Sequence, residues 1–119
     1  MATSTETIVE AIRAYRFTVC SEDELQRALA EALTREKLIV TREHRVFGGR
    51  IDLHVEHVDT VGIEVKVNGT PAEVGRQIRR YASGGDLDAL IVVTTRRSHL
   101  DLEDTDFDVP VHIELLETL

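Results

Sequence analysis

The sequence predicts an α/β fold in which helices flank a mixed sheet, and three observations lead to this prediction. Two segments, 51–56 and 63–67, alternate apolar and polar residues with the period of a strand and predict an antiparallel hairpin. A helical segment with clear capping signals follows at 70–83. The apolar run within 88–95 is typical of a strand covered on both faces and reached from the hairpin by a crossover helix.

The N-terminal third predicts two helices. The first is expected over 5–15, and the second begins after Ser21, which can cap it, with Glu24 three residues later to complete a capping box. Its expected buried stripe consists of Leu25, Leu29, Ala32 and Leu33. A first strand is expected over 37–46, and Gly48-Gly49 marks the bend that leads into the hairpin. In the hairpin, Ile51, Leu53 and Val55 are expected to point one way, and Asp52, His54 and Glu56 the other.

The helix expected at 70–83 has signals at both ends. Thr70, Pro71 and Glu73 supply an N-cap, a proline at the first helical position and the acid of a capping box, and Gly84-Gly85 ends the helix. Its apolar stripe of Val74, Ile78 and Ala82 leaves Gln77 and Tyr81 side by side, one turn apart. An edge strand is expected over 109–115, where Pro110 is tolerated, and the acidic run from Asp101 to Asp108 predicts a solvated loop.

Composition predicts a single globular domain spanning residues 1–119, because 119 residues that are 42% hydrophobic can enclose one modest core. Cys20 is the one cysteine, so we expect no internal disulfide, a small buried side chain at this position and a reducing, cytoplasmic location. No apolar stretch approaches the roughly 20 residues of a membrane span, and no signal-peptide pattern is present. We therefore expect no membrane association.

The residues that predict chemistry lie on the polar face of the hairpin. If the turn lies near 58–60, antiparallel pairing sets Asp52 across from Glu64-Val65-Lys66, where opposite Cβ atoms approach to roughly 4.5–5.5 Å. Magnesium takes oxygen ligands and is commonly held by one or two carboxylates together with water and substrate phosphates. Asp52, Glu64 and the Val65 carbonyl are thus predicted to bind Mg²⁺, with Lys66 beside the phosphodiester to stabilise its charge or to help activate water.

With these motifs the chain resembles the PD-(D/E)xK nuclease superfamily, over residues 21–95. The matching segments are Glu22-Asp23-Glu24-Leu25, Gly48-Gly49-Arg50-Ile51-Asp52, Gly62-Ile63-Glu64-Val65-Lys66 and Gln77-Ile78-Arg79-Arg80-Tyr81. The last is similar to the QxxxY motif of RecB-like and archaeal mismatch-endonuclease branches, and the acid that opens the helix is similar to that of Holliday-junction resolvases.

The resemblance implies a restriction-endonuclease-like αβββαβ core and metal-dependent cleavage of DNA, with Mg²⁺ as cofactor and Mn²⁺ as a substitute. It implies that Glu22, Asp52 and Glu64 are metal ligands, that Lys66 is catalytic and that Gln77 and Tyr81 support the site. The chain departs from the pattern at Ile51, where the superfamily name records proline. Three acids, Glu22, Glu24 and Glu43, remain alternatives for the outer ligand.

Net charge opposes nucleic-acid binding at long range, because 14 basic and 22 acidic residues give −8. The charge is uneven, however, since residues 35–97 hold 11 basic and 9 acidic side chains. Within them Arg76, Arg79 and Arg80 recur at helical spacing and predict a stripe that faces DNA phosphates. We expect weak, salt-sensitive DNA binding, and a homodimer if two strands are cut.

Simpler interpretations exist for each feature. Asp52 and Lys66 could form a cross-strand ion pair worth about 0–1 kcal/mol, Glu22 could serve only the helix dipole, and Tyr81 could be a core residue. Gln77 and the arginine stripe could be solvated surface.

His54 and His57 are three apart on a strand and point to opposite faces, which argues against a zinc site. The alternative function is a catalytically inactive binding module of the same fold, such as an inhibitory or assembly subunit.

Overall fold

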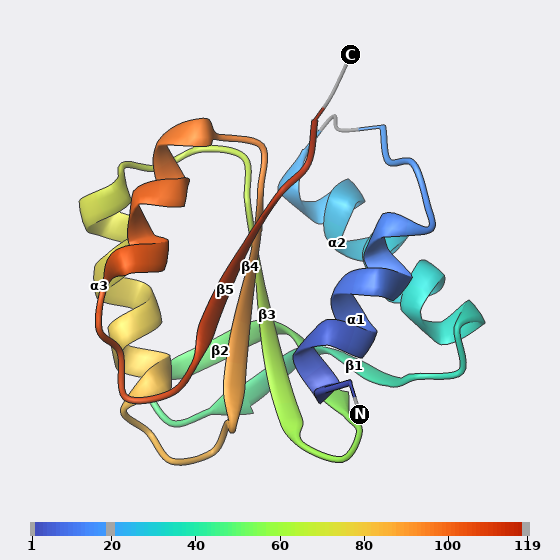
Figure 1. The fold of residues 1–119 in the computed structure, drawn as a ribbon, viewed down its shortest axis with the longest axis horizontal. Coiled ribbons are helices and arrows are strands. Elements are labelled where there is room, and N and C mark those ends of the chain that lie inside the picture. The colour runs from blue at the N-terminus through green and yellow to red at the C-terminus, as the bar shows by residue number, and fades with distance from the viewer. Residues whose placement is uncertain (1, 19–20, 118–119) are drawn as a thin grey trace.

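The computed structural model describes residues 2–18 and 21–117, and its helices cover both faces of one five-stranded sheet (Figure 1). The elements are α1 (Ser4–Arg13), α2 (Glu22–Arg35), β1 (Ile39–Val46), β2 (Gly49–Glu56), β3 (Thr60–Lys66), α3 (Pro71–Ala82), β4 (Ala89–Thr94), the 3₁₀ helix η1 (Arg97–Asp104) and β5 (Val111–Leu115). The strands lie in the order β1-β2-β3-β4-β5. The pairs β1·β2 and β2·β3 are antiparallel, whereas β3·β4 and β4·β5 are parallel, so the predicted mixed sheet is confirmed.

Capping residues and apolar patterns in the sequence predicted most helices and strands correctly. The Ser21 hydroxyl accepts a hydrogen bond from the Glu24 N–H at 3.1 Å and caps α2, whose predicted stripe is buried. Thr70 and Glu73 form the predicted capping box of α3, with Pro71 in its first turn. The expected crossover is also present, because α3 connects β3 to the parallel strand β4, in which all six residues are buried. The remaining boundaries differ from the predicted ranges by one to three residues, with the largest difference at the start of β3.

The segment between β4 and β5 differs from its prediction. A 3₁₀ helix, η1, takes up the first half of the acidic run that was expected to be a loop, although the acidic side chains are exposed as predicted. Leu102 in η1 is buried against the core, and His99 is completely buried. These two contacts, rather than the charges, decide that this segment turns helically. β5 then forms the predicted edge strand beside β4, and the Pro110 carbonyl accepts the Leu90 N–H at 3.0 Å.

The sheet separates two hydrophobic clusters, as the two layers of helices in Figure 1 suggest. One cluster packs α1 and α2 against one face, and includes Leu53, Val55 and Ile63. The other packs α3 and η1 against the opposite face. Ile51 belongs to this second cluster, so the prediction that it points the same way as Leu53 and Val55 is wrong.

The physical reason is a break in regular pairing around Asp52. The β1·β2 ladder pairs Arg42 with Leu53 and His44 with Ile51, but skips Glu43, which has a left-handed φ of 55°. The direction in which the side chains of β2 point therefore changes at Asp52. The residues on either side of this position pack in different hydrophobic clusters. This irregularity is local to the site described below.

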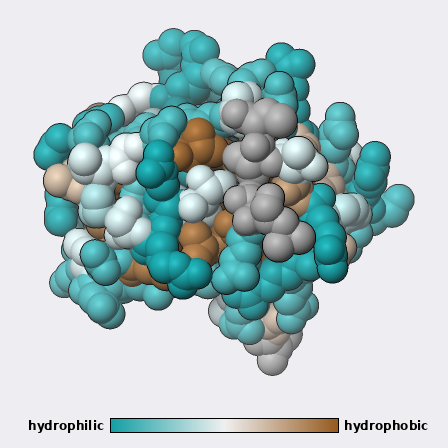
Figure 2. All heavy atoms as spheres, turned by 90° about the horizontal axis from the view of Figure 1, so that it is seen from above, coloured by the Kyte–Doolittle hydropathy of each residue, from teal (hydrophilic) through white to brown (hydrophobic). Residues whose placement is uncertain are grey.

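The surface is mainly polar. In the view from above, hydrophilic residues cover most of the face, and apolar residues show in small patches between them (Figure 2). Within residues 2–18 and 21–117, no helix combines the length and the apolar character that a membrane span requires. The expectation about Cys20 falls outside the described residues.

Candidate functional site

Asp52 and Glu64 interlock across the β2·β3 hairpin. Regular pairing runs from Glu56 opposite Thr60 to Leu53 opposite Ile63, which brings Asp52 next to Glu64 as predicted. The Asp52 N–H donates to Glu64 Oε1 at 3.0 Å, and the Val65 N–H donates to Asp52 Oδ2 at 2.8 Å. Each carboxylate thus takes the place of a backbone carbonyl in the ladder. The arrangement holds both acids rigidly at the end of the hairpin pairing.

The site has more negative charge than its one ammonium group can compensate. Glu64 is 2% exposed, and burial, together with the charge of Asp52, raises its pKa to about 8 despite the Asp52 N–H and Lys66. Burial also raises the pKa of Asp52, against the opposing effects of the Val65 N–H and Lys66. The Lys66 Nζ lies 3.6 Å from Glu64 Oε2. A cation placed here would therefore be attracted strongly.

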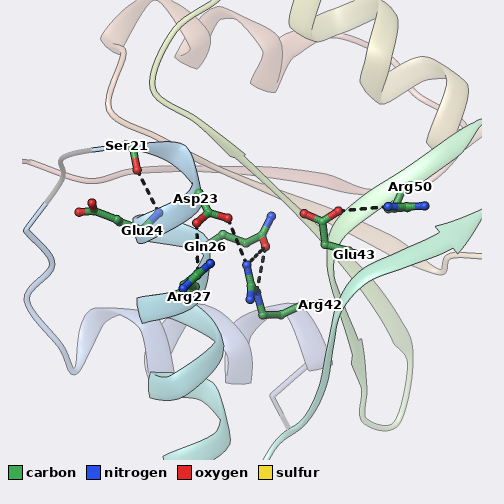
Figure 3. A network of polar contacts seen from close by, with 8 residues as sticks. All are labelled: Ser21, Asp23, Glu24, Gln26, Arg27, Arg42, Glu43 and Arg50. Atoms are coloured by element: carbon green, nitrogen blue, oxygen red, sulfur yellow. Dashed lines mark hydrogen bonds and ion pairs between the residues drawn. The ribbon is translucent and has the colours of Figure 1, made fainter.

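Glu22 reaches this site from α2. Its Oε1 accepts the Val67 N–H at 3.0 Å, just beyond the end of β3, and its negative charge contributes to the raised pKa of Asp52. Glu43 is exposed and lies 3.6 Å from Arg50, as drawn in Figure 3, although its charge also acts on Asp52. Glu24 is exposed and points away from Arg42 and Glu43 in the same figure. Of the three alternatives for the outer acid, Glu22 is the one that accepts a hydrogen bond from the backbone directly after the strand carrying Glu64.

The donor atoms fit a hard cation. Asp52, Glu64 and Glu22 each use one carboxylate oxygen for a backbone N–H. The second Glu64 oxygen lies 3.6 Å from Lys66 Nζ. Residues 2–18 and 21–117 contain no preformed group of three metal-ligating His, Cys, Asp or Glu side chains. Magnesium does not require such a group, because water and substrate phosphate complete its shell.

Tyr81 and Gln77 connect α3 to the strand that carries Asp52. The Tyr81 hydroxyl donates to the Arg50 carbonyl at 3.0 Å, and Gln77 Nε2 donates to the same hydroxyl at 3.4 Å. The Tyr81 ring is also 4% exposed and part of the core under α3. Tyr81 is therefore a core residue, and its role in supporting the site stays a prediction. Its hydroxyl fixes the backbone two residues before Asp52.

The predicted arginine stripe divides into two parts. Arg76 and Arg80 border a hollow of about 310 Å³ that opens beside Lys66 and Gln77. Its complete lining is Lys66, Asn68, Gly69, Glu73, Val74, Arg76, Gln77 and Arg80. The Arg79 guanidinium instead lies over the Phe107 ring, 5.3 Å from its centroid. Two of the three arginines thus face the site, and the third packs on the segment before β5.

Comparison with known proteins bears on the fold. No family model and no curated protein sequence matches the chain. Among solved structures, it is similar to the crystal structure of a repair endonuclease from Pyrococcus abyssi, with a TM-score of 0.61 and 18% identity over 87% of this chain and 50% of that one. The chain has a restriction-endonuclease-like fold. It spans half the length of that endonuclease, so the likeness concerns the fold of this domain.

The restriction-endonuclease-like domain also contains supporting residues that sequence reasoning missed. Arg96 donates from Nε to the Val67 carbonyl at 2.9 Å and from Nη2 to Asn68 Oδ1 at 2.6 Å, and so holds the segment that follows Lys66. The buried His99 bonds to the Gly69 carbonyl through Nε2 at 2.7 Å and to Thr94 Oγ1 through Nδ1. Because a carbonyl only accepts, Nε2 must carry the proton. No spacing in the sequence connects these residues, since they meet only when β4 lies beside β3.

His54 of β2 and His57, just after the end of that strand, have different partners. The His54 ring stacks on the His44 ring, with centroids 4.1 Å apart, and His57 Nδ1 is 2.8 Å from the Ser4 hydroxyl. The His44–His54 contact was not foreseen. Burial, followed by the charge of His44, lowers the pKa of His54.

Proposed function

We propose that this domain is a metal-dependent nuclease that hydrolyses DNA phosphodiester bonds by attack of water, in the manner of the PD-(D/E)xK superfamily and its branch with a QxxxY motif. The observation that carries the proposal is the pair of half-buried Asp52 and buried Glu64, interlocked across a hairpin beside a single lysine. Burying two acids together costs stability. That cost is understandable if the pair binds a cation that the reaction needs.

In this proposal Asp52, Glu64 and the Val65 carbonyl hold Mg²⁺, for which Mn²⁺ can substitute, and Glu22 is the outer acid. The bound ion would supply Lewis-acid stabilisation of the phosphate and would lower the pKa of water. Glu22 fits this role because its carboxylate already contacts the backbone at the end of β3 and interacts with the charge of Asp52. Glu43, paired with Arg50, and the outward-facing Glu24 fit it less well.

Lys66 would act on the phosphodiester itself. Its side chain is 18% exposed, so the ammonium group can reach a phosphate in solvent while it remains next to Glu64. As the bond from the water oxygen to phosphorus forms and the bond to the leaving oxygen breaks, negative charge grows on the phosphoryl oxygens, and an ammonium group placed there lowers the barrier. Tyr81 and Gln77 would act as positioning residues, because they hold the backbone that leads to Asp52.

The hollow beside Lys66 would receive the DNA backbone. Arg76 and Arg80 offer two guanidinium groups on its rim, one helical turn apart, which suits neighbouring phosphates of one strand. Glu73 on the same rim and the net charge of −8 weaken this attraction. Binding should therefore be modest in affinity and should decrease steeply with added salt.

The test is cleavage of duplex, single-stranded and branched DNA by the wild type and by Asp52→Asn, Glu64→Gln and Lys66→Ala, with Mg²⁺ and with Mn²⁺. Each variant should lose at least about 100-fold in rate, by analogy with the loss of one charge-stabilising group. Glu103→Gln is the matched control, because Glu103 is an exposed acid of η1 far along the chain from the site. Equal cleavage by all proteins would trace the activity to a contaminant or to another site.

A catalytically inactive binding module is the second candidate, and the charge distribution favours it. The chain outside residues 35–97 carries 3 basic and 13 acidic side chains, which suits a basic protein partner better than DNA. Failure of the wild type to cut any of these substrates with either metal would support this function. The homodimer belongs to the nuclease proposal, because two copies would be needed to cut two strands. Sedimentation of the protein with and without DNA would measure it.

A further inference from the structure

Phe47 places an exposed aromatic ring at the tip of the β1·β2 hairpin. Val46 and Gly49 form the last pair of the ladder, so Phe47 and Gly48 make a two-residue turn. Gly48 has a φ of 95°, which favours glycine at this position. The Phe47 side chain is 67% exposed, whereas turn positions are normally occupied by small or polar residues. An aromatic ring held out into solvent at a turn therefore requires an explanation.

The tip is fixed in place rather than free to move. The Phe47 N–H donates to Asp86 Oδ2 at 2.5 Å. The tip also packs against the end of α3, because a Cβ atom at Gly84 would lie 2.7 Å from the Phe47 Cβ, and a Cβ atom at Gly48 would lie 3.2 Å from the Arg80 carbonyl oxygen. The glycines allow this close approach. The exposed ring is thus presented on a rigid support, which keeps the entropy cost of binding low.

Three arginines lie on the elements that meet at the tip: Arg45 and Arg50 on β1 and β2, and Arg80 in α3. Arg45 and Arg50 are direct partners across the β1·β2 ladder, an arrangement that brings like charges together and is unfavourable in the free protein. Arg80 contributes a third cation from the last turn of α3, against which the tip packs. Within the described residues Arg45 and Arg80 pair with no carboxylate, while Arg50 is 3.6 Å from Glu43. An anion bound here would relieve the repulsion.

The tip is also close to the candidate catalytic residues. The strand that leaves the turn runs to Asp52 within five residues of Phe47, so their Cα atoms are separated by at most about 17 Å. The Tyr81 hydroxyl binds the Arg50 carbonyl between them. Phe47 therefore lies within the length of a few nucleotides of Asp52.

We infer that Phe47 is a stacking platform for an unpaired base, and that Arg45, Arg50 and Arg80 bind the phosphates on either side of that base. The inference rests on the proposed nuclease function and specifies its substrate class: nucleic acid with unpaired bases near the cleavage point. Aromatic rings in a positively charged setting are the usual means of binding single strands, because every base has a flat face to stack while cations hold the backbone. A fully paired duplex offers no free face to the ring.

The test measures binding of oligonucleotides that contain 2-aminopurine, whose fluorescence falls on stacking, with Ca²⁺ in place of Mg²⁺. Phe47→Ala should bind the single strand about 5- to 100-fold more weakly than the wild type and lose the quenching. Phe47→Trp should restore both, and binding of a fully paired duplex should stay within about twofold of wild type. Val58→Ala is the matched control, because Val58 is an exposed apolar residue in the other turn of β2 and should behave as the wild type.

Equal binding and equal quenching by Phe47→Ala and the wild type would overturn the inference. So would loss of self-association in Phe47→Ala with unchanged oligonucleotide binding, since the ring would then be a contact between copies of the chain. Cleavage assays distinguish the failure of the stacking platform from the failure of the proposed nuclease function. If Phe47→Ala behaves as wild type while cleavage still depends on Asp52, the nuclease function stands and only the platform fails. If the wild type neither binds nor cuts nucleic acid, both fail.

Discussion

Glu64 combines deep burial with a raised pKa and a contact with Lys66. An acid with 2% exposure beside a second acid departs from the usual rule that glutamate stays at the surface, and such local violations concentrate at functional sites. Its second oxygen lies 3.6 Å from Lys66 Nζ, while the first accepts the Asp52 N–H. Two predictions at this scale follow from the charge of the pair.

The first prediction concerns the dependence of stability on pH. The pKa of Glu64 is raised from 4.5 to about 8, so the folded protein binds a proton that the unfolded chain releases between these values. Proton binding to the folded state stabilises it, and the free energy of unfolding should fall as pH rises from 4.5 to 8 in the absence of metal. We expect the free energy of unfolding to fall by on the order of 2 kcal/mol. One pKa unit corresponds to about 1.4 kcal/mol, but the full shift is not counted because Glu64 and Asp52 titrate as a coupled pair. Urea denaturation across this range measures it, and Glu64→Gln should remove most of the slope. An unchanged slope in the variant would contradict the prediction.

The second concerns Asp52→Asn. Burial raises the pKa of Asp52, and Asp52 in turn raises that of Glu64, so neutralising Asp52 removes a repulsion. The asparagine oxygen can still accept the Val65 N–H. We expect the variant without metal to gain on the order of 1 kcal/mol, or roughly 4 °C in melting temperature, and to lose the stabilisation by Mg²⁺. A lower melting temperature with an unchanged magnesium response would instead indicate a simple ion pair with Lys66.

At the scale of the elements, close packing between β3 and the layer of α3 positions Glu64. Gly62 precedes Glu64 by two residues on the same face, and a Cβ atom there would lie 2.8 Å from Leu87 Cδ1 and 3.2 Å from Ile51 Cγ1 and Leu90 Cδ2. The absence of a side chain lets the strand approach its neighbours. Ile51 reaches this contact because the facing of β2 changes at Asp52.

Gly62→Ala should therefore destabilise the protein by about 1–3 kcal/mol, the usual cost of overpacking a well-filled core. If the strand shifts to make room, Glu64 moves as well, and the magnesium response should weaken together with stability. Thermal unfolding with and without Mg²⁺ measures both effects. A fully stable variant with normal magnesium binding would show that the strand is not held by this contact.

At the scale of the whole molecule, one ion pair joins the first helix to the last strand. Arg13 of α1 donates to Glu114 of β5 from Nε at 2.8 Å and from Nη2 at 2.9 Å. Burial alone would raise the pKa of Glu114, but its hydrogen bonds with Arg13 and His112 outweigh burial and lower it. The stability that this carboxylate contributes is therefore present above pH 4.5 and is lost as pH falls below that value.

Arg13→Gln should cost about 1 kcal/mol near neutral pH, a low value because Arg13 is itself 63% exposed and screened by solvent. Arg16→Gln is a suitable control, since Arg16 is exposed nearby and forms no ion pair among the described residues. Urea denaturation at neutral and at acidic pH should show that the difference between the variants disappears in acid. Equal stability of both variants at neutral pH would mean that the pair contributes nothing measurable.

Most helices and strands could be predicted because their signals are local. Caps at Ser21 and Thr70, period-two alternation in the hairpin and the apolar run of β4 act within a few residues of one another, so the chain carries them without reference to its fold. η1 could not be predicted in this way. Its helical turn depends on burying His99 and Leu102 against elements that are distant in sequence.

The sequence by itself determined the order of the elements and the meeting of Asp52 with Glu64-Val65-Lys66, because pairing along one hairpin brings residues twelve apart into register. The tertiary structure alone decided that Glu22 contacts the backbone just after β3, that Arg79 packs on Phe107, and that Ile51 turns to the core under α3. These outcomes depend on how whole helices dock against the sheet. Docking is set by burial and shape over the entire molecule, which no short stretch of sequence encodes.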